Sequence, residues 1–84
     1  MNVLLVEDDK RVGDFIVTEL TAVGHCCVHE LDGVAGLRAA QNATFDVMVI
    51  DRMMPRMDGL TLINALREAG NDTPVVILSA LGEV

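Results

Sequence analysis

Two apolar runs of this chain end in carboxylates. Residues 3–6 stop at Glu7 and Asp8, and residues 47–50 stop at Asp51. Short β-branched runs with polar ends are typical of strands buried on both faces of a parallel sheet. If the two strands are parallel neighbours, the three acids meet at the carboxyl edge of the sheet, where open α/β sheets bind ligands. Converging carboxylates repel one another unless a cation lies among them, so the pattern predicts a site for a hard metal ion.

Strand and helix signals alternate along the chain, and these elements would position the acids. Asp8 or Asp9 is placed to cap a first helix, and Gly24 is placed to end it. Asp32 and Asp58 are placed to cap two later helices. Such alternation with short links predicts a parallel sheet with right-handed crossovers and helices on both faces. The predicted strands are residues 3–6, 25–31, 46–51 and 74–79, and the apolar helical positions are Val12, Phe15, Ile16, Leu20 and Val23, then Val34, Leu37 and Ala40, then Leu62, Ile63 and Leu66.

Composition restricts the function classes. At 84 residues we expect one small domain, and with 51% apolar but only 2% aromatic residues its core must be aliphatic. A net charge of −7 argues against nucleic-acid binding by this segment, because phosphate contacts need clustered Lys and Arg. No apolar run approaches the ~20 residues of a membrane span, and the N-terminus has no signal-peptide pattern. Cys26 and Cys27 are adjacent, which suits neither a disulfide framework nor a metal knuckle, so we expect reduced thiols in the cytoplasm.

Three motifs together resemble the receiver domain of bacterial response regulators, in the form that precedes a winged-helix DNA-binding domain. They are Val6-Glu7-Asp8-Asp9, the run from Val49 to Gly59 in which Pro-x-x-Asp-Gly follows Asp51, and Ile77-Leu78-Ser79-Ala80. The likeness covers essentially the whole chain in the family's order and spacing. It implies a flavodoxin-like, doubly wound α/β fold with strand order 2-1-3-4, in the cytoplasm. It also implies a phosphoacceptor that serves a histidine kinase in transcription regulation and is no enzyme beyond assisting its own phosphorylation and dephosphorylation.

The resemblance assigns roles to individual residues. Asp51 would be the phosphoacceptor, a carboxylate nucleophile toward a phosphoryl group. Asp8 and Asp51, with Glu7 largely through water and the backbone carbonyl of Met53, would hold Mg²⁺. The attack of the Asp51 carboxylate on a phosphoryl group brings two anions together, so it needs a cation to bridge them.

Further roles concern the phosphoryl group itself. The Ser79 hydroxyl would donate to a phosphoryl oxygen and so sense phosphorylation. The backbone N–H groups of Arg52 and Ala80 would help to hold the phosphoryl group. His25 and His29 flank the second predicted strand, and we expect structural roles for them, far from the acids.

Simpler interpretations compete with each assignment. Glu7 and Asp8 could form a solvated loop beside a helix cap, and Asp51 could be a turn residue that ends a strand. The joint presence of Ser79 and the Pro-x-x-Asp-Gly loop favours the chemical interpretation. An aspartyl-phosphate hydrolase of the haloacid-dehalogenase kind uses the same nucleophile, but that family has a second Asp where Met53 stands here.

The chain also departs from the family pattern. A complete receiver has a fifth strand and two further helices, which carry a Lys that pairs with the phosphoryl group, so we expect residues 1–84 to be a C-terminally truncated receiver domain. The fourth predicted strand, residues 75–78, is fully apolar, and an exposed apolar edge favours association. We therefore expect a homodimer or a swapped oligomer through that edge. The alternative function is an interaction fragment with a vestigial acid site.

Overall fold

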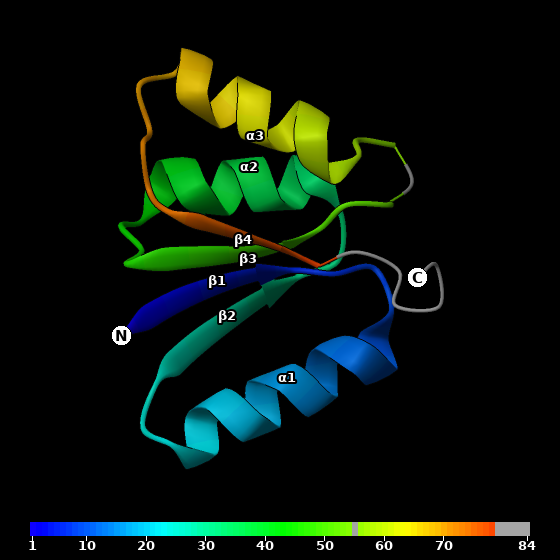
Figure 1. Ribbon diagram of the computed structural model, residues 1–84, viewed down its shortest axis with the longest axis vertical. Helices are drawn as coiled ribbons and strands as arrows, with labels where there is room; N and C mark the ends of the chain where they lie inside the picture. The colour runs from blue at the N-terminus through cyan, green and yellow to red at the C-terminus, as the bar shows by residue number, and fades with distance from the viewer. Residues whose placement is uncertain (55, 79–84) are drawn as a thin grey trace.

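Strands and helices alternate in the computed structural model, which describes residues 1–54 and 56–78. All strand pairs are parallel, and the sheet order is β2-β1-β3-β4, as the resemblance implied. The flavodoxin-like α/β prediction is therefore confirmed for the described residues (Figure 1). The elements are β1 (Asn2–Val6), α1 (Lys10–Ala22), β2 (Cys26–Glu30), α2 (Gly33–Asn42), β3 (Val47–Asp51), α3 (Gly59–Glu68) and β4 (Val75–Leu78).

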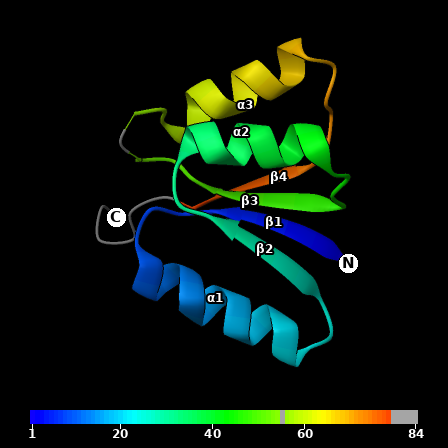
Figure 2. The ribbon, with the colours of Figure 1, turned by 180° about the vertical axis from the view of Figure 1, so that it is seen from behind.

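The sheet forms a middle layer between helices. Figures 1 and 2 show α1 on one face and α2 with α3 on the other. Side chains alternate between the two faces of a strand, so the central strands bury residues on both sides. Val3 and Leu5 alternate with Leu4 and Val6 along β1, and all four are buried. The main core lies between the sheet and α2 with α3, and it consists of Leu4, Val6, Ala40, Met48, Ile50, Leu62 and Leu66.

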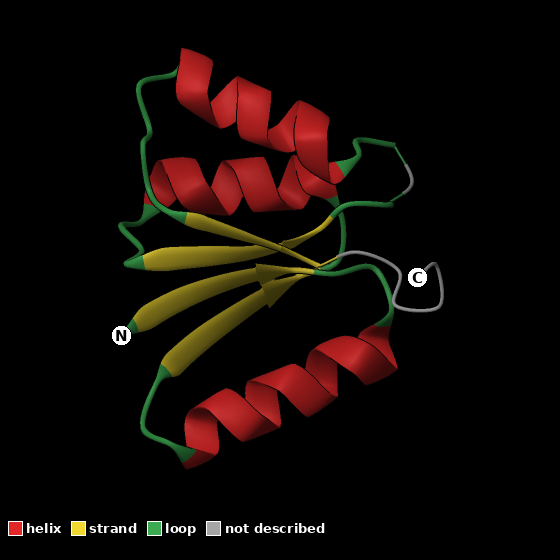
Figure 3. Ribbon diagram, in the orientation of Figure 1, coloured by secondary structure: helices red, strands yellow, loops and turns green. Residues whose placement is uncertain are grey.

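An aspartate caps each helix of the described residues. Figure 3 shows these helices in red. Asp9, rather than Asp8, caps α1, because its side chain accepts from the backbone N–H groups of Arg11 and Val12. Asp32 and Asp58 cap α2 and α3 as predicted. These caps satisfy N–H groups that have no partner within the helix. They also leave Asp8, directly after the strand-end Glu7, available for another role.

The helix faces differ in part from the predicted ones. Val34 was expected to face the sheet but is 40% exposed, and the buried positions of α2 are Gly33, Gly36 and Ala40. A side chain at Gly36 would come within 2.7 Å of Val6 Cγ2, so the missing side chain lets the helix approach the sheet closely. In α1, Ile16 and Leu20 are half-buried, whereas Val12, Phe15 and Val23 are exposed.

Two predictions from composition concern the whole chain. Cys26 and Cys27 are both free thiols, in line with the expectation of no disulfide. Among the described residues, the helices are too short or too polar to cross a membrane.

Gly59 begins α3 directly beneath the end of β3. Its N–H donates to the carbonyl of Arg52, 2.9 Å away. A Cβ atom at Gly59 would lie 2.5 Å from the backbone oxygen of Asp51 and 2.9 Å from Cα of Arg52. The loop can therefore close beneath Asp51 only because residue 59 has no side chain.

We expect Gly59→Ala to destabilise the fold by about 1–3 kcal/mol, because the new methyl group meets backbone that has to move. Urea denaturation measures the loss. Leu60→Ala is the matched control: Leu60 is adjacent and 44% exposed, so its truncation should cost well under ~1 kcal/mol. Equal stability of Gly59→Ala and the unaltered chain would contradict this account of the loop.

Candidate functional site

The three predicted acids converge at the carboxyl edge of the sheet. One carboxylate oxygen each from Glu7, Asp8 and Asp51 lies within 4.8 Å of the others. They meet because β1 and β3 pair in parallel with Val6 opposite Ile50, so the chain leaves both strands at the same edge. We call these three residues the acid cluster.

Burial and like charge act together on Glu7. The residue is only 6% exposed, and its Oε2 accepts from the N–H of Asp9 at 3.0 Å. Burial is the main cause that raises the pKa of Glu7 from 4.5 to about 7, the nearby Asp51 charge raises it further, and the Asp9 N–H opposes both. Near neutral pH Glu7 is therefore protonated in part of the molecules.

The donor set of the cluster suits a hard cation. All three groups are carboxylates, and oxygen ligands are those that Mg²⁺ and Ca²⁺ prefer. Glu7 is buried, Asp51 is half-buried and Asp8 is exposed, so an ion would enter beside Asp8 and keep contact with water. This exposure suits Mg²⁺, which retains several of its waters.

The backbone after Asp51 contributes a donor that sequence reasoning missed. The N–H of Met53 points to Oδ1 of Asp51 at 3.2 Å. The N–H of Arg52, which the resemblance assigns to the phosphoryl group, instead belongs to the β-ladder, where it donates to the carbonyl of Leu78 at 2.9 Å. Successive N–H groups of an extended chain point in opposite directions, so a shift of one residue changes the partner. Met53 thus lies beside Asp51, and the role of its backbone carbonyl as a metal ligand stays a prediction.

The loop between β3 and α3 is anchored on α2. Arg56 adopts a left-handed backbone (φ 71) and its Nη2 lies 3.3 Å from Oδ2 of Asp32, the residue that caps α2. Beside this ion pair, a side chain at Gly33 would overlap the Met57 backbone oxygen, 2.6 Å from the Cβ position. The loop that carries Met53 is therefore held against the start of α2.

Ser79 and Ala80 are outside the described residues, and β4 ends just before them at Leu78, opposite Asp51. Lys10 pairs with Asp14 one turn along α1 at 3.0 Å.

The prediction that both histidines lie far from the acids is wrong for His29. Its Nε2 is 2.8 Å from the backbone oxygen of Glu7. His25 instead lies at the opposite end of β2, where its Nδ1 accepts from the N-terminal ammonium at 3.0 Å. The two histidines lie at opposite ends of β2, and the parallel pairing with β1 puts the end that carries His29 beside Glu7.

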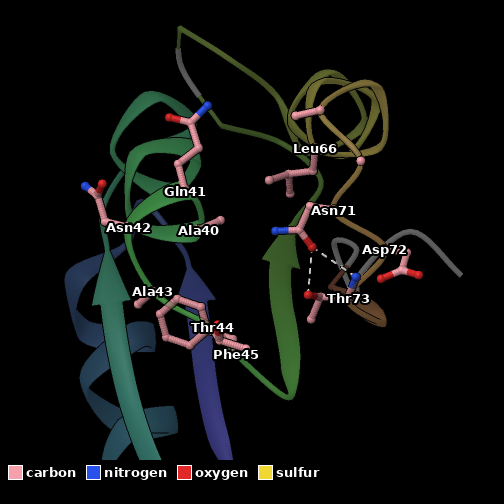
Figure 4. Close-up of a pocket in the computed structure, with 12 residues that line it drawn as sticks. Ala40, Gln41, Asn42, Ala43, Thr44, Phe45, Leu66, Asn71, Asp72 and Thr73 are labelled. Carbon is pink, nitrogen blue, oxygen red and sulfur yellow. Dashed lines mark hydrogen bonds between the residues drawn. The ribbon is translucent and has the colours of Figure 1, made fainter.

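A cavity of about 560 Å³ opens at the other edge of the sheet (Figure 4). It lies where α2 and α3 end, and its lining includes Gln41, Phe45 and Asp72. Within it, Oδ1 of Asn71 accepts from the Thr73 hydroxyl at 2.7 Å and from the Thr73 N–H at 3.0 Å (Figure 4). These groups satisfy one another, and the acid cluster lies at the opposite ends of the strands.

Comparison with known proteins agrees with the geometry. The sequence matches the family described as the response regulator receiver domain over residues 3–84. It is 37% identical over 84 residues to the probable transcriptional regulatory protein SilR of Salmonella typhimurium, covering 100% of this chain and 37% of that protein. It is 36% identical to the transcriptional regulatory protein QseB of Haemophilus influenzae, covering 95% of this chain and 36% of QseB. The chain thus spans little more than a third of these relatives.

Solved structures show the same fold. The receiver domain of the Francisella response regulator 1452 is 40% identical with a TM-score of 0.92, and the match covers 99% of this chain and 69% of that one. FixJ-N is 26% identical with a TM-score of 0.90, covering 99% of this chain and 66% of that one.

Without divalent cations, Glu7 should make stability fall as pH rises. The folded chain holds this proton with a pKa of about 7 against 4.5, so the stabilisation is complete below pH 4.5 and is lost as pH rises through about 7. Urea denaturation in EDTA across this range should show a loss on the order of 2 kcal/mol relative to Glu7→Gln, whose side chain stays neutral. Glu68→Gln, at an exposed position of α3, is the control and should follow the unaltered chain. Parallel pH curves for the unaltered chain and Glu7→Gln would contradict the raised pKa.

Proposed function

The chain belongs to the response regulator receiver family, and we propose that it is the phosphoacceptor module of a two-component response regulator. In this proposal Asp51 accepts a phosphoryl group from a histidine kinase. The observation that carries it is the convergence of Glu7, Asp8 and Asp51 within 4.8 Å at the carboxyl edge of the sheet. Acids of a solvated loop would all be exposed, whereas Glu7 of this cluster is only 6% exposed.

The proposed reaction moves one phosphoryl group. An oxygen of Asp51 forms a bond to phosphorus while the bond from phosphorus to the kinase imidazole nitrogen breaks, and the imidazole keeps that electron pair. The Met53 N–H, 3.2 Å from Oδ1, holds the Asp51 carboxylate in one orientation. Proper orientation of a nucleophile lowers the barrier to attack. The chain acts as an acceptor, and we assign it no catalysis beyond its own phosphorylation and dephosphorylation.

Glu7, Asp8 and Asp51, with the backbone carbonyl of Met53, would hold Mg²⁺. When bound, this ion neutralises charge between the Asp51 carboxylate and the incoming phosphoryl oxygens. Ser79 directly follows Leu78, which pairs with Asp51, and we propose that its hydroxyl donates to a phosphoryl oxygen.

Transcription regulation is proposed for the larger protein. The curated relatives SilR and QseB carry names of transcriptional regulatory proteins, and this chain aligns with 37% and 36% of their lengths. A charge of −7 makes these 84 residues a poor DNA ligand, so DNA contact would belong to another part of such a protein. A cytoplasmic location follows from the proposed kinase partner.

Beryllofluoride with Mg²⁺ tests the phosphoacceptor. We expect the backbone amide resonances of Asp51 and Met53 to shift on addition of both. Asp51→Asn should abolish this response, because an amide lacks the anionic oxygen that bonds to beryllium. Asp72→Asn, an exposed acid at the opposite edge, is the matched control and should respond like the unaltered chain. Unchanged NMR spectra of the unaltered chain would contradict the proposal.

A second activity, self-association, is favoured by β4. Among the described residues β4 pairs with β3 alone, and its Val76 and Ile77 are 52% and 44% exposed. An apolar strand with an unpaired edge is a template for another strand. We propose a homodimer, or a swapped oligomer, that forms through this edge.

Sedimentation equilibrium should reveal a dimer whose fraction rises with concentration, and Ile77→Lys should shift it to monomer, because charge on an edge strand opposes pairing. Val23→Lys, at a position that is 70% exposed after α1, serves as the control and should leave the dimer intact. A monomer at every concentration would contradict the association.

A further inference from the structure

His29 links β2 to the acid cluster through its ring. The residue lies opposite Leu5 in the parallel register. Its ring lies against Gly13 of α1, so its side chain belongs to the face of the sheet that α1 covers. From there Nε2 comes within 2.8 Å of the Glu7 carbonyl oxygen. A carbonyl oxygen only accepts hydrogen bonds, so Nε2 carries the hydrogen and donates it.

This bond falls where the regular ladder between β1 and β2 ends. The last paired residues are Val6 and Glu30, after which the Glu7 N–H still donates to the Glu30 carbonyl at 3.1 Å. Beyond this point the chain after β2 turns toward α2, which begins at Gly33. The imidazole of His29 supplies a donor to the Glu7 carbonyl, so β2 holds both backbone polar groups of Glu7.

The absence of a side chain at Gly13 leaves room for the imidazole ring of His29. A Cβ atom at this α1 position would lie 2.0 Å from Cε1 of His29, so the ring packs directly on the helix backbone. Glycine in a helix interior costs about 1 kcal/mol relative to alanine. The close contact with His29 explains why glycine stands at position 13 despite this cost. In turn, α1 holds the imidazole ring against Glu7.

We propose that His29 is a positioning residue of the acid cluster, an inference that rests on the proposed function. The Glu7 carbonyl belongs to the planar peptide unit that joins Glu7 to Asp8. Holding that oxygen fixes the plane, and the plane sets the direction from which both side chains leave the backbone. His29 thereby directs two carboxylates toward Asp51 without itself binding the ion or the phosphoryl group.

Mg²⁺ affinity, measured by NMR titration at about pH 8, above the raised pKa of Glu7, tests the role. His29→Leu removes the donor, and we expect Mg²⁺ to bind about three- to tenfold more weakly. His29→Gln keeps an N–H near the place of Nε2, and we expect affinity within twofold of the unaltered chain. Gly13→Ala displaces the ring, so it should weaken binding as His29→Leu does. His25→Leu, at the other end of β2, is the matched control and should leave affinity unchanged.

Three results would overturn the proposal. One is an unchanged Mg²⁺ affinity in His29→Leu, and another is an equal loss in His29→Leu and His29→Gln, which would reduce His29 to packing. If the Leu variant does not fold, the unaltered chain decides the matter: the Nε2 resonance of His29 should shift along the same Mg²⁺ titration curve as the Asp51 amide, and a resonance that stays fixed would count against the role. Failure of the proposed function differs from all of these, because the unaltered chain would then bind no Mg²⁺ at all.

Discussion

Parallel pairing of β1 with β3 sets Val6 opposite Ile50, so the residues that follow both strands leave the sheet at one edge. Every feature of the acid cluster depends on that register. A shift by one residue would reverse the faces of all side chains in a strand and bury the acids or separate them. The register is held by apolar side chains, with Leu4 and Val6 packed beside Met48 and Ile50 in the main core. Burial of aliphatic side chains thus supplies the free energy that keeps three carboxyl groups together.

Much of the fold was predictable because its signals are local. Apolar runs located the strands to within one residue at most ends, and aspartates at position 8 or 9 and at positions 32 and 58 marked the helix starts. The meeting of Glu7 with Asp51 followed from the sheet type, since parallel strands share a carboxyl edge. The strand order required the resemblance to receiver domains, because local pattern does not determine which strands become neighbours.

Other features depend on tertiary geometry that periodicity does not contain. Val34 fits the helical pattern yet is exposed, because Gly33 and Gly36 let α2 approach the sheet on another face. The N–H that points to Asp51 belongs to Met53, whereas the N–H of Arg52, which was expected at the phosphoryl group, donates to Leu78 in the ladder to β4. His29 reaches Glu7 because the register sets it beside Leu5, and α1 offers a glycine above it. All three features depend on the direction in which a side chain or a backbone N–H group points in the folded chain.

The central claim is that the acid cluster presents Asp51 as a nucleophile toward phosphorus. Mass spectrometry of the intact chain, after incubation with a small acyl phosphate such as acetyl phosphate and Mg²⁺, tests this without a kinase. The account predicts the added mass of a single phosphoryl group that requires Mg²⁺ and is absent in Asp51→Asn. No added mass in the unaltered chain, or the same added mass in Asp51→Asn, would contradict it.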